Sequence, residues 1–300
     1  MNNLKKLGLT ALAGSLVATS VSAGELAVTG GASLDYSSSS LATGNGWSMG
    51  DSVNFNGSGD VNGMDVSLQI ELDGGTYDDY SLKIDTGDGG AITFSGASKG
   101  VGGLNNYGDI VPTAYEEVYD ATDGVDYGVV GGISSTSSFA YNGTFGGLTI
   151  SAFYNPASVS SSSIVLQYAD LIDGLTIGAG TGEVTTTKDE ESIWVKYVTG
   201  AITVGFQRSE KDYSATGTSD EDADHMGVSF AVNEDLTISM GRQEVDFSGS
   251  GMSDEESSGI SASYTMGGLT IAGHSNKTDS LGGTSGANEE SKSINFAFAF

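Results

Sequence analysis

The sequence predicts an all-β fold, an antiparallel up-and-down β-barrel of about sixteen strands. Apolar and polar residues alternate with a period of two along most of the chain after residue 23, and a short hairpin motif recurs. The composition suits strands and tight turns, since 46 of the 300 residues are Gly and only 2 are Pro. An even number of strands lets the first strand pair antiparallel with the last and close a barrel.

Charge and cysteine content exclude several functions. The chain has 39 acidic and 11 basic residues, a formal net charge of −28, two His and no Cys. Without Cys there is no disulfide framework and no thiolate metal site. The net charge argues against nucleic acid as a partner, because phosphates would be repelled. With 38% hydrophobic residues, 13 Tyr and 11 Phe, the chain is too apolar for a disordered protein.

The first 23 residues have the pattern of a signal peptide. Lys5 and Lys6 precede an apolar run from Leu7 to Ala18, and the segment 21–23 supplies the small residues of a cleavage site. The run is too short to span a bilayer as a helix, which disfavours the alternative of a membrane anchor. We therefore expect an exported chain whose mature part, residues 24–300, forms one domain.

Alternation along the mature chain defines the strands. Residues 64–73 alternate without a break, which places four aliphatic side chains on one face and polar side chains on the other. The predicted strands are 25–36, 48–56, 64–72, 80–86, 91–97, 137–145, 148–155, 163–169, 175–183, 192–198, 201–208, 225–232, 236–244, 259–266, 269–274 and 292–300.

Connections of two kinds alternate between these strands. A tight turn followed by Leu-Thr-Ile occurs at 147–150, 174–177, 235–238 and 268–271. Polar segments at 183–191, 209–224, 244–258 and 275–290 predict long loops at the other end of the barrel, and the acids at 220–224, 254–256 and 289–290 are expected there. The longest segment without alternation, 98–135, lies between the fifth and sixth strands.

Aromatic residues gather near the tight-turn ends in the same register as the aliphatic face. Such a ring is typical of the aromatic girdle with which a transmembrane barrel meets the lipid–water interface, so we expect the apolar face to point outward. The alternative is packing between two sheets of a sandwich. The predicted girdle consists of Phe145, Tyr168, Tyr197, Phe230, Tyr264, Phe298 and Phe300.

Taken together, the signal peptide, the amphipathic strands, the long third loop and the C-terminal Phe300 resemble the general porins of Gram-negative bacteria. The Gly-rich hairpins and acidic balance are most similar to the alphaproteobacterial, Rhodobacter-type porins. This resemblance implies a homotrimeric diffusion channel for small hydrophilic solutes and ions in the outer membrane, with the third loop folded into the lumen. It also implies contact with lipid and lipopolysaccharide, recognition of Phe300 by the barrel-insertion machinery, and no catalysis or cofactor.

The resemblance turns attention to charges in the lumen. It places the acids of segment 98–135 on the constriction loop, and alternation adds further charged residues to the inner wall, whereas Arg208 and Arg242 fall in the outward register. An acidic wall with few bases predicts a preference for cations. The constriction acids are Asp109, Glu116, Glu117, Asp120, Asp123 and Asp126, and the wall residues are Asp65, Glu71, Asp73, Asp85, Lys83 and Lys196.

Other functions remain as alternatives. Inward Trp194 and Phe153, with the Tyr residues of the third loop, would suit a channel specific for sugars. Clustered acids in the loops would suit Ca²⁺, although no EF-hand pattern is present. A secreted acidic β-solenoid adhesin shares the composition but needs a short repeating coil. An enzyme built on Asp224, His225 and His274 has no supporting motif.

Overall fold

A computed structural model describes residues 24–41, 44–96, 102–120, 125–131, 136–169 and 171–300. The expected signal peptide, residues 1–23, and one of the expected constriction acids, Asp123, lie outside the described residues. In the described part of the chain, no helix combines the length and the hydropathy needed to cross a bilayer.

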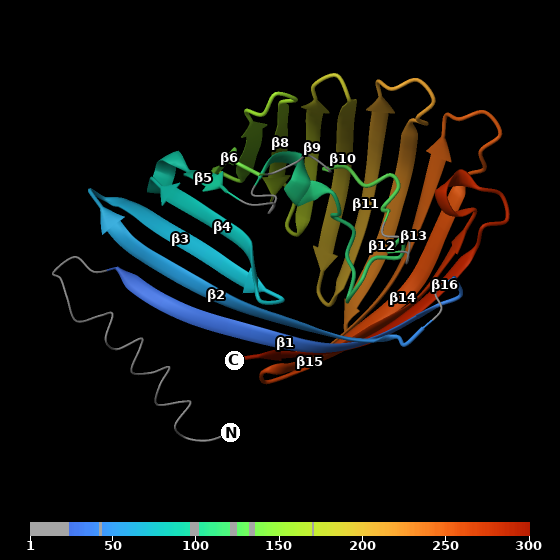
Figure 1. Ribbon diagram of the computed structural model, residues 1–300, viewed down its shortest axis with the longest axis horizontal. Helices are drawn as coiled ribbons and strands as arrows, with labels where there is room; N and C mark the ends of the chain where they lie inside the picture. The colour runs from blue at the N-terminus through green and yellow to red at the C-terminus, as the bar shows by residue number, and fades with distance from the viewer. Residues whose placement is uncertain (1–23, 42–43, 97–101, 121–124, 132–135, 170) are drawn as a thin grey trace.

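Sixteen antiparallel strands close into one barrel, as the sequence predicts (Figure 1). Each strand pairs with its neighbours in sequence, and β1 pairs with β16. The closed barrel rules out the solenoid and the two-sheet sandwich. The strands are β1 Glu25–Ser39, β2 Trp47–Val61, β3 Met64–Asp73, β4 Thr76–Asp85, β5 Ala91–Ser95, β6 Ser138–Phe145, β7 Leu148–Asn155, β8 Ser161–Ala169, β9 Leu175–Val184, β10 Lys188–Thr199, β11 Ile202–Tyr213, β12 Glu221–Ala231, β13 Leu236–Phe247, β14 Glu255–Met266, β15 Leu269–Asp279 and β16 Glu289–Ala299.

Backbone hydrogen bonds extend the seam of the barrel past the end of β16. The N–H of Gly30 donates to the carbonyl of Phe300 at 2.9 Å, and the N–H of Phe300 donates to the carbonyl of Gly30 at 3.0 Å. The terminal residue therefore continues the ladder between the first and last strands. Three short 3-10 helices complete the secondary structure of the described residues: η1 Gly87–Gly89, η2 Gly103–Tyr107 and η3 Leu281–Gly283.

The apolar face of the strands points outward. On β10, Ile193, Val195 and Tyr197 alternate with Ser192 and Trp194. Ile193 is 56% exposed, whereas Trp194 is only 4% exposed, so the aliphatic side chains line the outer surface and the others line the inside. A soluble protein of this fold would place its aliphatic side chains the other way round.

The strands are longer than expected at the loop end. Segments expected to be loops are largely strand, and the connections there shrink to 185–187, 214–220, 248–254 and 280–288. The acids at 221–224, 255–256 and 289–290 lie within strands, which corrects the expectation that they are loop residues. Hydropathy alternation fades where both faces of a strand are polar, but the backbone ladder continues, so the sequence pattern underestimates these strands.

The segment between β5 and β6, residues 96–137, is called loop L3 below. Its described residues 102–120 and 125–131 lie inside the ring of strands (Figure 1). A compact apolar core forms where L3 meets the wall. Leu104 and Val130 of L3 are buried against Val165 of β8 and Trp194 of β10, and Tyr107 stacks on Trp194 with ring centroids 5.1 Å apart. The core of the molecule therefore sits between L3 and the wall, and it fixes the position of L3.

Candidate functional site

Side chains on the inner wall hold the backbone of L3. The side-chain amide of Gln207 on β11 binds L3 through both of its polar atoms. Its Nε2 donates to the carbonyl of Tyr107 at 2.8 Å, and its Oε1 accepts from the N–H of Ile110 at 2.9 Å. Serine hydroxyls accept from other L3 amides: Ser151 from Gly103 at 2.8 Å, Ser163 from Leu104 at 2.9 Å, Ser239 from Ala114 at 2.9 Å and Ser261 from Tyr115 at 3.1 Å.

The second half of L3 is held by charged residues. Glu221 of β12 is buried, and its carboxylate accepts from the N–H of Gly128 at 2.6 Å and from Nζ of Lys211 at 3.0 Å. The carboxylate of Glu190 on β10 accepts from the N–H of Gly131 at 2.8 Å. Because these bonds use backbone groups that would otherwise be buried without partners, they define where L3 runs.

Inward glycines make room for L3. A Cβ atom at Gly205 on β11 would lie 2.5 Å from Cδ of Pro112, and one at Gly227 on β12 would lie 2.3 Å from Cγ1 of Val111. Both distances are shorter than any real contact between carbon atoms. The absence of side chains at these two wall positions allows L3 to pack directly on the sheet.

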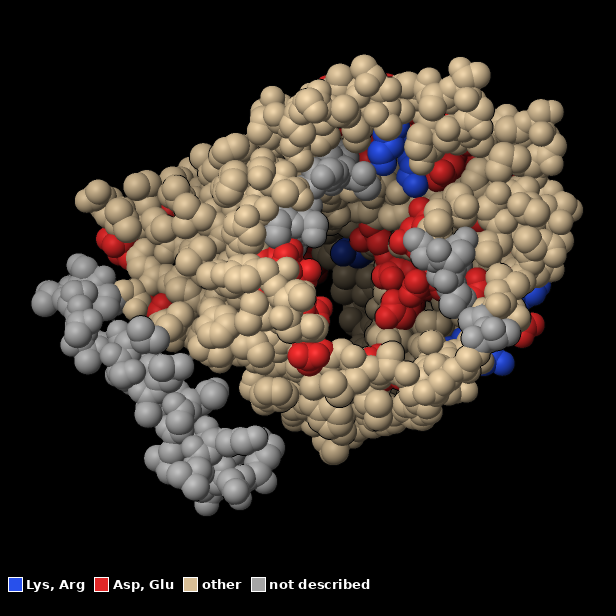
Figure 2. All heavy atoms as spheres, viewed as in Figure 1, with Lys and Arg blue, Asp and Glu red and all other residues tan. Residues whose placement is uncertain are grey.

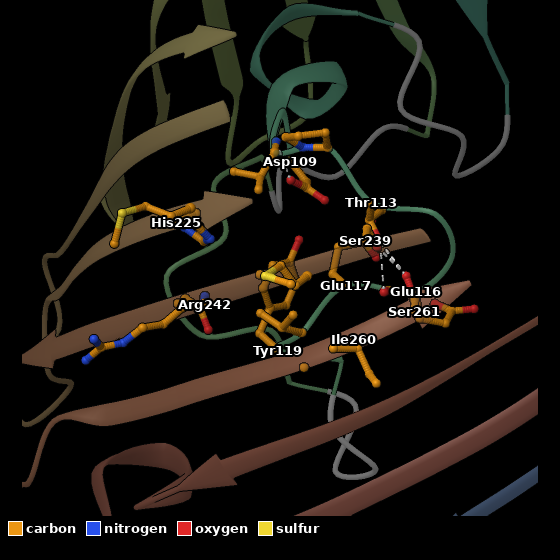
Figure 3. Close-up of a pocket in the computed structure, with 18 residues that line it drawn as sticks. Asp109, Thr113, Glu116, Glu117, Tyr119, His225, Ser239, Arg242, Ile260 and Ser261 are labelled. Carbon is orange, nitrogen blue, oxygen red and sulfur yellow. Dashed lines mark hydrogen bonds between the residues drawn. The ribbon is translucent and has the colours of Figure 1, made fainter. Parts of the chain in front are cut away.

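Three of the constriction acids line a cavity between L3 and the barrel wall. Asp109, Glu116 and Glu117 enclose ≈ 30 Å³ between L3 and the strands β12 to β14, together with Tyr119 and His225 (Figure 3). Burial and a hydrogen bond with the carboxyl group of Asp109 raise the pKa of Glu117 to about 8. The cavity has room for about two water molecules, so solutes do not pass through it.

Glu116 also interacts with Asp120, and residues 115–120 are called the tip of L3 below. Burial and a hydrogen bond with the carboxyl group of Glu116 raise the pKa of Asp120 to about 6. The ring of Tyr115 stacks on His274 of β15, with centroids 6.0 Å apart. Burial together with the negative charges of Glu116 and Asp35 raises the pKa of Tyr115 to about 12, which places Asp35 of β1 within electrostatic reach of the tip.

Asp126, the last acid in the described part of L3, lies beside Lys211, which is bonded to Glu221. The backbone carbonyl of Asp126 accepts from Nζ of Lys211 at 3.4 Å. Among the described residues, Asp109, Glu116 and Glu117 thus line the cavity behind L3, Asp120 interacts with Glu116, and Asp126 lies beside Lys211.

The wall formed by β16 and β1 to β3 also carries carboxylates. Asp35 accepts hydrogen bonds from Oγ of Ser33, at 2.6 Å, and from the amide of Asn295. On the next strands, the amide of Asn54 donates to Glu71 at 3.1 Å. Figure 2 shows acidic side chains on both sides of the central opening.

Register separates the expected wall residues along the barrel axis. Asp65 lies opposite Asp85, and Lys83 forms an ion pair with Asp85 at 2.9 Å, all at the tight-turn end of β3 and β4. Glu71 and Asp73 lie toward the loop end of β3, where Asp73 is exposed. Lys196 takes the inward register three residues from the turn end of β10.

Arg208 and Arg242 lie on the outer face and do not reach the lumen. Arg208 pairs with Asp224 at 3.3 Å, and Arg242 pairs with Glu244 at 3.1 Å and with Glu256 at 3.2 Å. All of these side chains are about half exposed. They form a charged belt above the outward aliphatic residues, so the two arginines cannot supply positive charge to the constriction.

Aromatic residues expected to form a slide for sugars are covered by L3. Trp194 and Phe153 point inward, but they are 4% and 3% exposed, respectively. Trp194 is stacked under Tyr107. These two side chains are therefore unavailable to a passing solute, which corrects that interpretation.

The expected girdle residues lie at the tight-turn ends of their strands. Each is on the outward face and each is at least 37% exposed. Phe300 is the most exposed of them, at 80%. Contact of these rings with lipid stays a prediction.

Carboxylates converge at two places where a metal ion is conceivable. Glu71, Asp78 and Asp79 form one group, and Glu244, Asp246 and Asp254 form the other, with one ligand oxygen from each residue within 4.8 Å of the others. Calcium binding stays a prediction, which a shift of thermal unfolding on adding EDTA or Ca²⁺ would test.

Sequence reasoning missed the residues that hold L3. Gln207, Gln243, Ser209 and Glu221 all occupy the inward register of their strands, and all are buried. Gln243 donates to the carbonyl of Tyr127 at 2.8 Å. The sequence does show that these are polar side chains in the inward register. Alternation alone, however, does not distinguish a side chain that binds L3 from one that faces water in the lumen.

No protein-family model and no curated protein sequence matches this chain. Solved structures do match. The trimer form of OmpT, an outer membrane protein of Vibrio cholerae, has a TM-score of 0.71 at 11% identity, covering 93% of this chain and 100% of that one. A refined porin structure has 0.69 at 16%, covering 92% and 100%, and a variant of the porin of Rh. blastica has 0.65 at 13%, covering 92% and 100%. At these identities the likeness shows the fold alone: the chain shares the sixteen-stranded barrel of porins and of an outer membrane protein of V. cholerae.

Proposed function

We propose that this protein is a general porin, a passive channel that lets small hydrophilic solutes and ions cross the outer membrane of a Gram-negative bacterium. The observation that supports this most is L3, which is anchored inside a closed barrel and narrows a lumen lined with carboxylates. A passive channel requires no reacting groups, only a wet passage of limited width with suitable charge. The proposal therefore includes no catalysis and no cofactor.

The membrane location is part of the proposal. Its support is the outward aliphatic face, the aromatic residues at the tight-turn ends and the signal-peptide pattern of residues 1–23. The proposal extends to lipid and lipopolysaccharide as surroundings and to insertion through recognition of Phe300. The trimer form of the V. cholerae protein supports a homotrimer, and membership of the alphaproteobacterial porins rests on the sequence resemblance.

Selectivity for cations follows from the acids around the constriction. Carboxylates in a narrow passage raise the local concentration of cations and repel anions, and the effect weakens as salt shortens the Debye length to about 8 Å or less. We expect purified protein to form stable conducting units in a planar bilayer. A tenfold KCl gradient should give a zero-current potential of the sign that K⁺ permeation produces. Absence of conductance would refute the channel, whereas conductance with anion preference would refute only the selectivity.

A further inference from the structure

Positive charge is scarce wherever the lumen is narrow. Lys5, Lys6 and Lys99 lie outside the described residues, which leaves eight Lys and Arg residues to consider. Those in the outward register are Arg208, Arg242, Lys277 and Lys292. The inward ones are Lys83, Lys188, Lys196 and Lys211.

None of the four inward lysines provides a base opposite the tip of L3. Lys188 and Lys211 are bonded to the buried carboxylates of Glu190 and Glu221. Lys83 is paired with Asp85 at the turn end, and Lys196 also lies toward that end of the barrel. Within the described residues, positive charge is therefore used to hold L3 or is placed away from the constriction.

The wall formed by β16 and β1 to β3 carries carboxylates supported by amides and hydroxyls. Ser33 and Asn295 donate to Asp35, and Asn54 donates to Glu71. No described Lys or Arg forms an ion pair with Asp35. Because these donors are uncharged, they do not neutralise the carboxylates that they contact. Negative charge thus lies both on L3 and on the wall beside it, and Figure 2 shows acidic side chains on both sides of the central opening.

We infer that this channel favours cationic organic solutes, such as primary amines, and gives no advantage to zwitterions over neutral solutes of the same size. The inference rests on the proposed channel function and names its preferred solutes. A cation is attracted by the carboxylates of L3 and by those of the wall. For a zwitterion, the attraction of its ammonium group is offset by the repulsion of its carboxylate. A constriction with acids on one side and bases on the other would instead attract both ends of a zwitterion.

Four solutes of nearly equal size separate these possibilities: glycinamide as the cation, glycolamide as the neutral solute, glycine as the zwitterion and glycolate as the anion. Their fluxes into proteoliposomes are compared at about pH 6, where the amine of glycinamide is protonated. At low salt we expect glycinamide to enter roughly three- to tenfold faster than glycolamide, as a wall potential of about one to two kT requires. Glycine should match glycolamide within about twofold, and glycolate should be slowest. At about 1 M salt the differences should shrink.

A charge reversal on the facing wall tests the cause. Asp35→Lys puts a base within electrostatic reach of Tyr115, the neighbour of Glu116, so glycine should gain on glycolamide and glycinamide should lose its advantage. Asp212→Lys makes the same change of charge on the exposed outer face of β11 and should leave all four fluxes unchanged. Asp35→Asn serves if the Lys variant does not fold, and should reduce the glycinamide preference by a smaller factor.

The outcomes separate the inference from the channel itself. If no solute enters, the proposed function fails. If all four enter but glycine outpaces glycolamide, or glycinamide has no advantage, the channel stands and the inference is overturned. Equal effects of the Asp35 and Asp212 substitutions would also overturn it, because the preference would then come from overall charge. Lys99→Gln measures the contribution of the Lys99 charge to the four fluxes. If the parent prefers glycine to glycolamide and this variant does not, Lys99 is the base that attracts the carboxylate end of glycine.

Discussion

Gln207 of β11 accepts a hydrogen bond from the N–H of Ile110 at 2.9 Å, joining residues 97 positions apart in the chain. The same side-chain amide donates to Tyr107, so it acts as a bridge between the wall and L3. Gln207 is fully buried, and its bonds satisfy two backbone groups in a place that water does not reach.

Replacing this side chain should loosen L3. Gln207→Leu leaves the N–H of Ile110 and the carbonyl of Tyr107 without that partner, which costs about 1–3 kcal/mol of unfolding free energy. We expect a lower midpoint in urea unfolding and noisier single-channel current, because L3 samples other positions. Gln167→Leu, an inward Gln on β8 with no bond to L3 among the described contacts, is the matched control. Equal current noise in the two variants would contradict the anchoring role.

Filling the space under L3 should displace the loop. In Gly227→Val the added carbon atoms would collide with Val111, whose Cγ1 lies 2.3 Å from the position of a Cβ. Overpacking of this kind destabilises by about 1–3 kcal/mol, and the strain is relieved if L3 moves into the lumen. We therefore expect lower stability together with lower conductance. Gly31→Val on β1, where a Cβ would meet only one backbone oxygen at 3.4 Å, should change conductance far less.

Removal of a buried cation should destabilise the wall. Lys211 and Glu221 are bonded at 3.0 Å with both side chains 8% exposed. Lys211→Met leaves the carboxylate of Glu221 buried without its partner, which costs about 3–5 kcal/mol. Lys277→Met removes an exposed partner of Asp279 on the outer face and should leave urea unfolding unchanged, since exposed ion pairs contribute little. A Lys211 variant as stable as the parent would show that the ion pair makes no net contribution.

Conduction and stability should both depend on pH. The pKa values of Asp120 and Glu117 are raised to about 6 and about 8, each first by burial and then by a neighbouring carboxyl group. As pH rises through these values the loop gains negative charge, so cation preference should increase between about pH 5 and pH 9. Glu117→Gln should abolish the upper part of this increase, while Asp212→Asn on the outer face should preserve it.

Stability should change in the opposite direction. Because the folded-state pKa of Glu117 lies above its usual 4.5, the folded protein binds more protons than the unfolded chain between about pH 4.5 and pH 8. The stabilising contribution of the protonated group is present below this window and is lost as pH rises through it. Urea unfolding across this range should show a decline that Glu117→Gln reduces. A rise in stability with pH that depends on Glu117 would contradict the raised pKa of this group.

Loop L3 shows where sequence reasoning reached its limit. Absence of alternation marked residues 98–135 as a loop, and the resemblance implied that it enters the lumen. Which of its acids lie in the cavity behind the loop was not predictable: Asp109, Glu116 and Glu117 line it, while Asp120 does not and interacts with Glu116. That division depends on anchors such as Gln207 and Ser239, which lie about 100 or more residues away in the chain.

The sequence by itself determined the barrel, the number of strands and the outward direction of the aliphatic face. These properties depend on local alternation and on the hydrogen bonding of neighbouring strands, so residues 64–73 or 193–197 carry the signal within one segment. Only the tertiary structure decided the course of L3, the burial of Trp194 and the proximity of Asp35 to Tyr115. These three features depend on contacts between segments that are distant in the chain. An inward position can hold a side chain that binds L3, a glycine that makes room for L3, or an exposed carboxylate, and only the packing of L3 decides which.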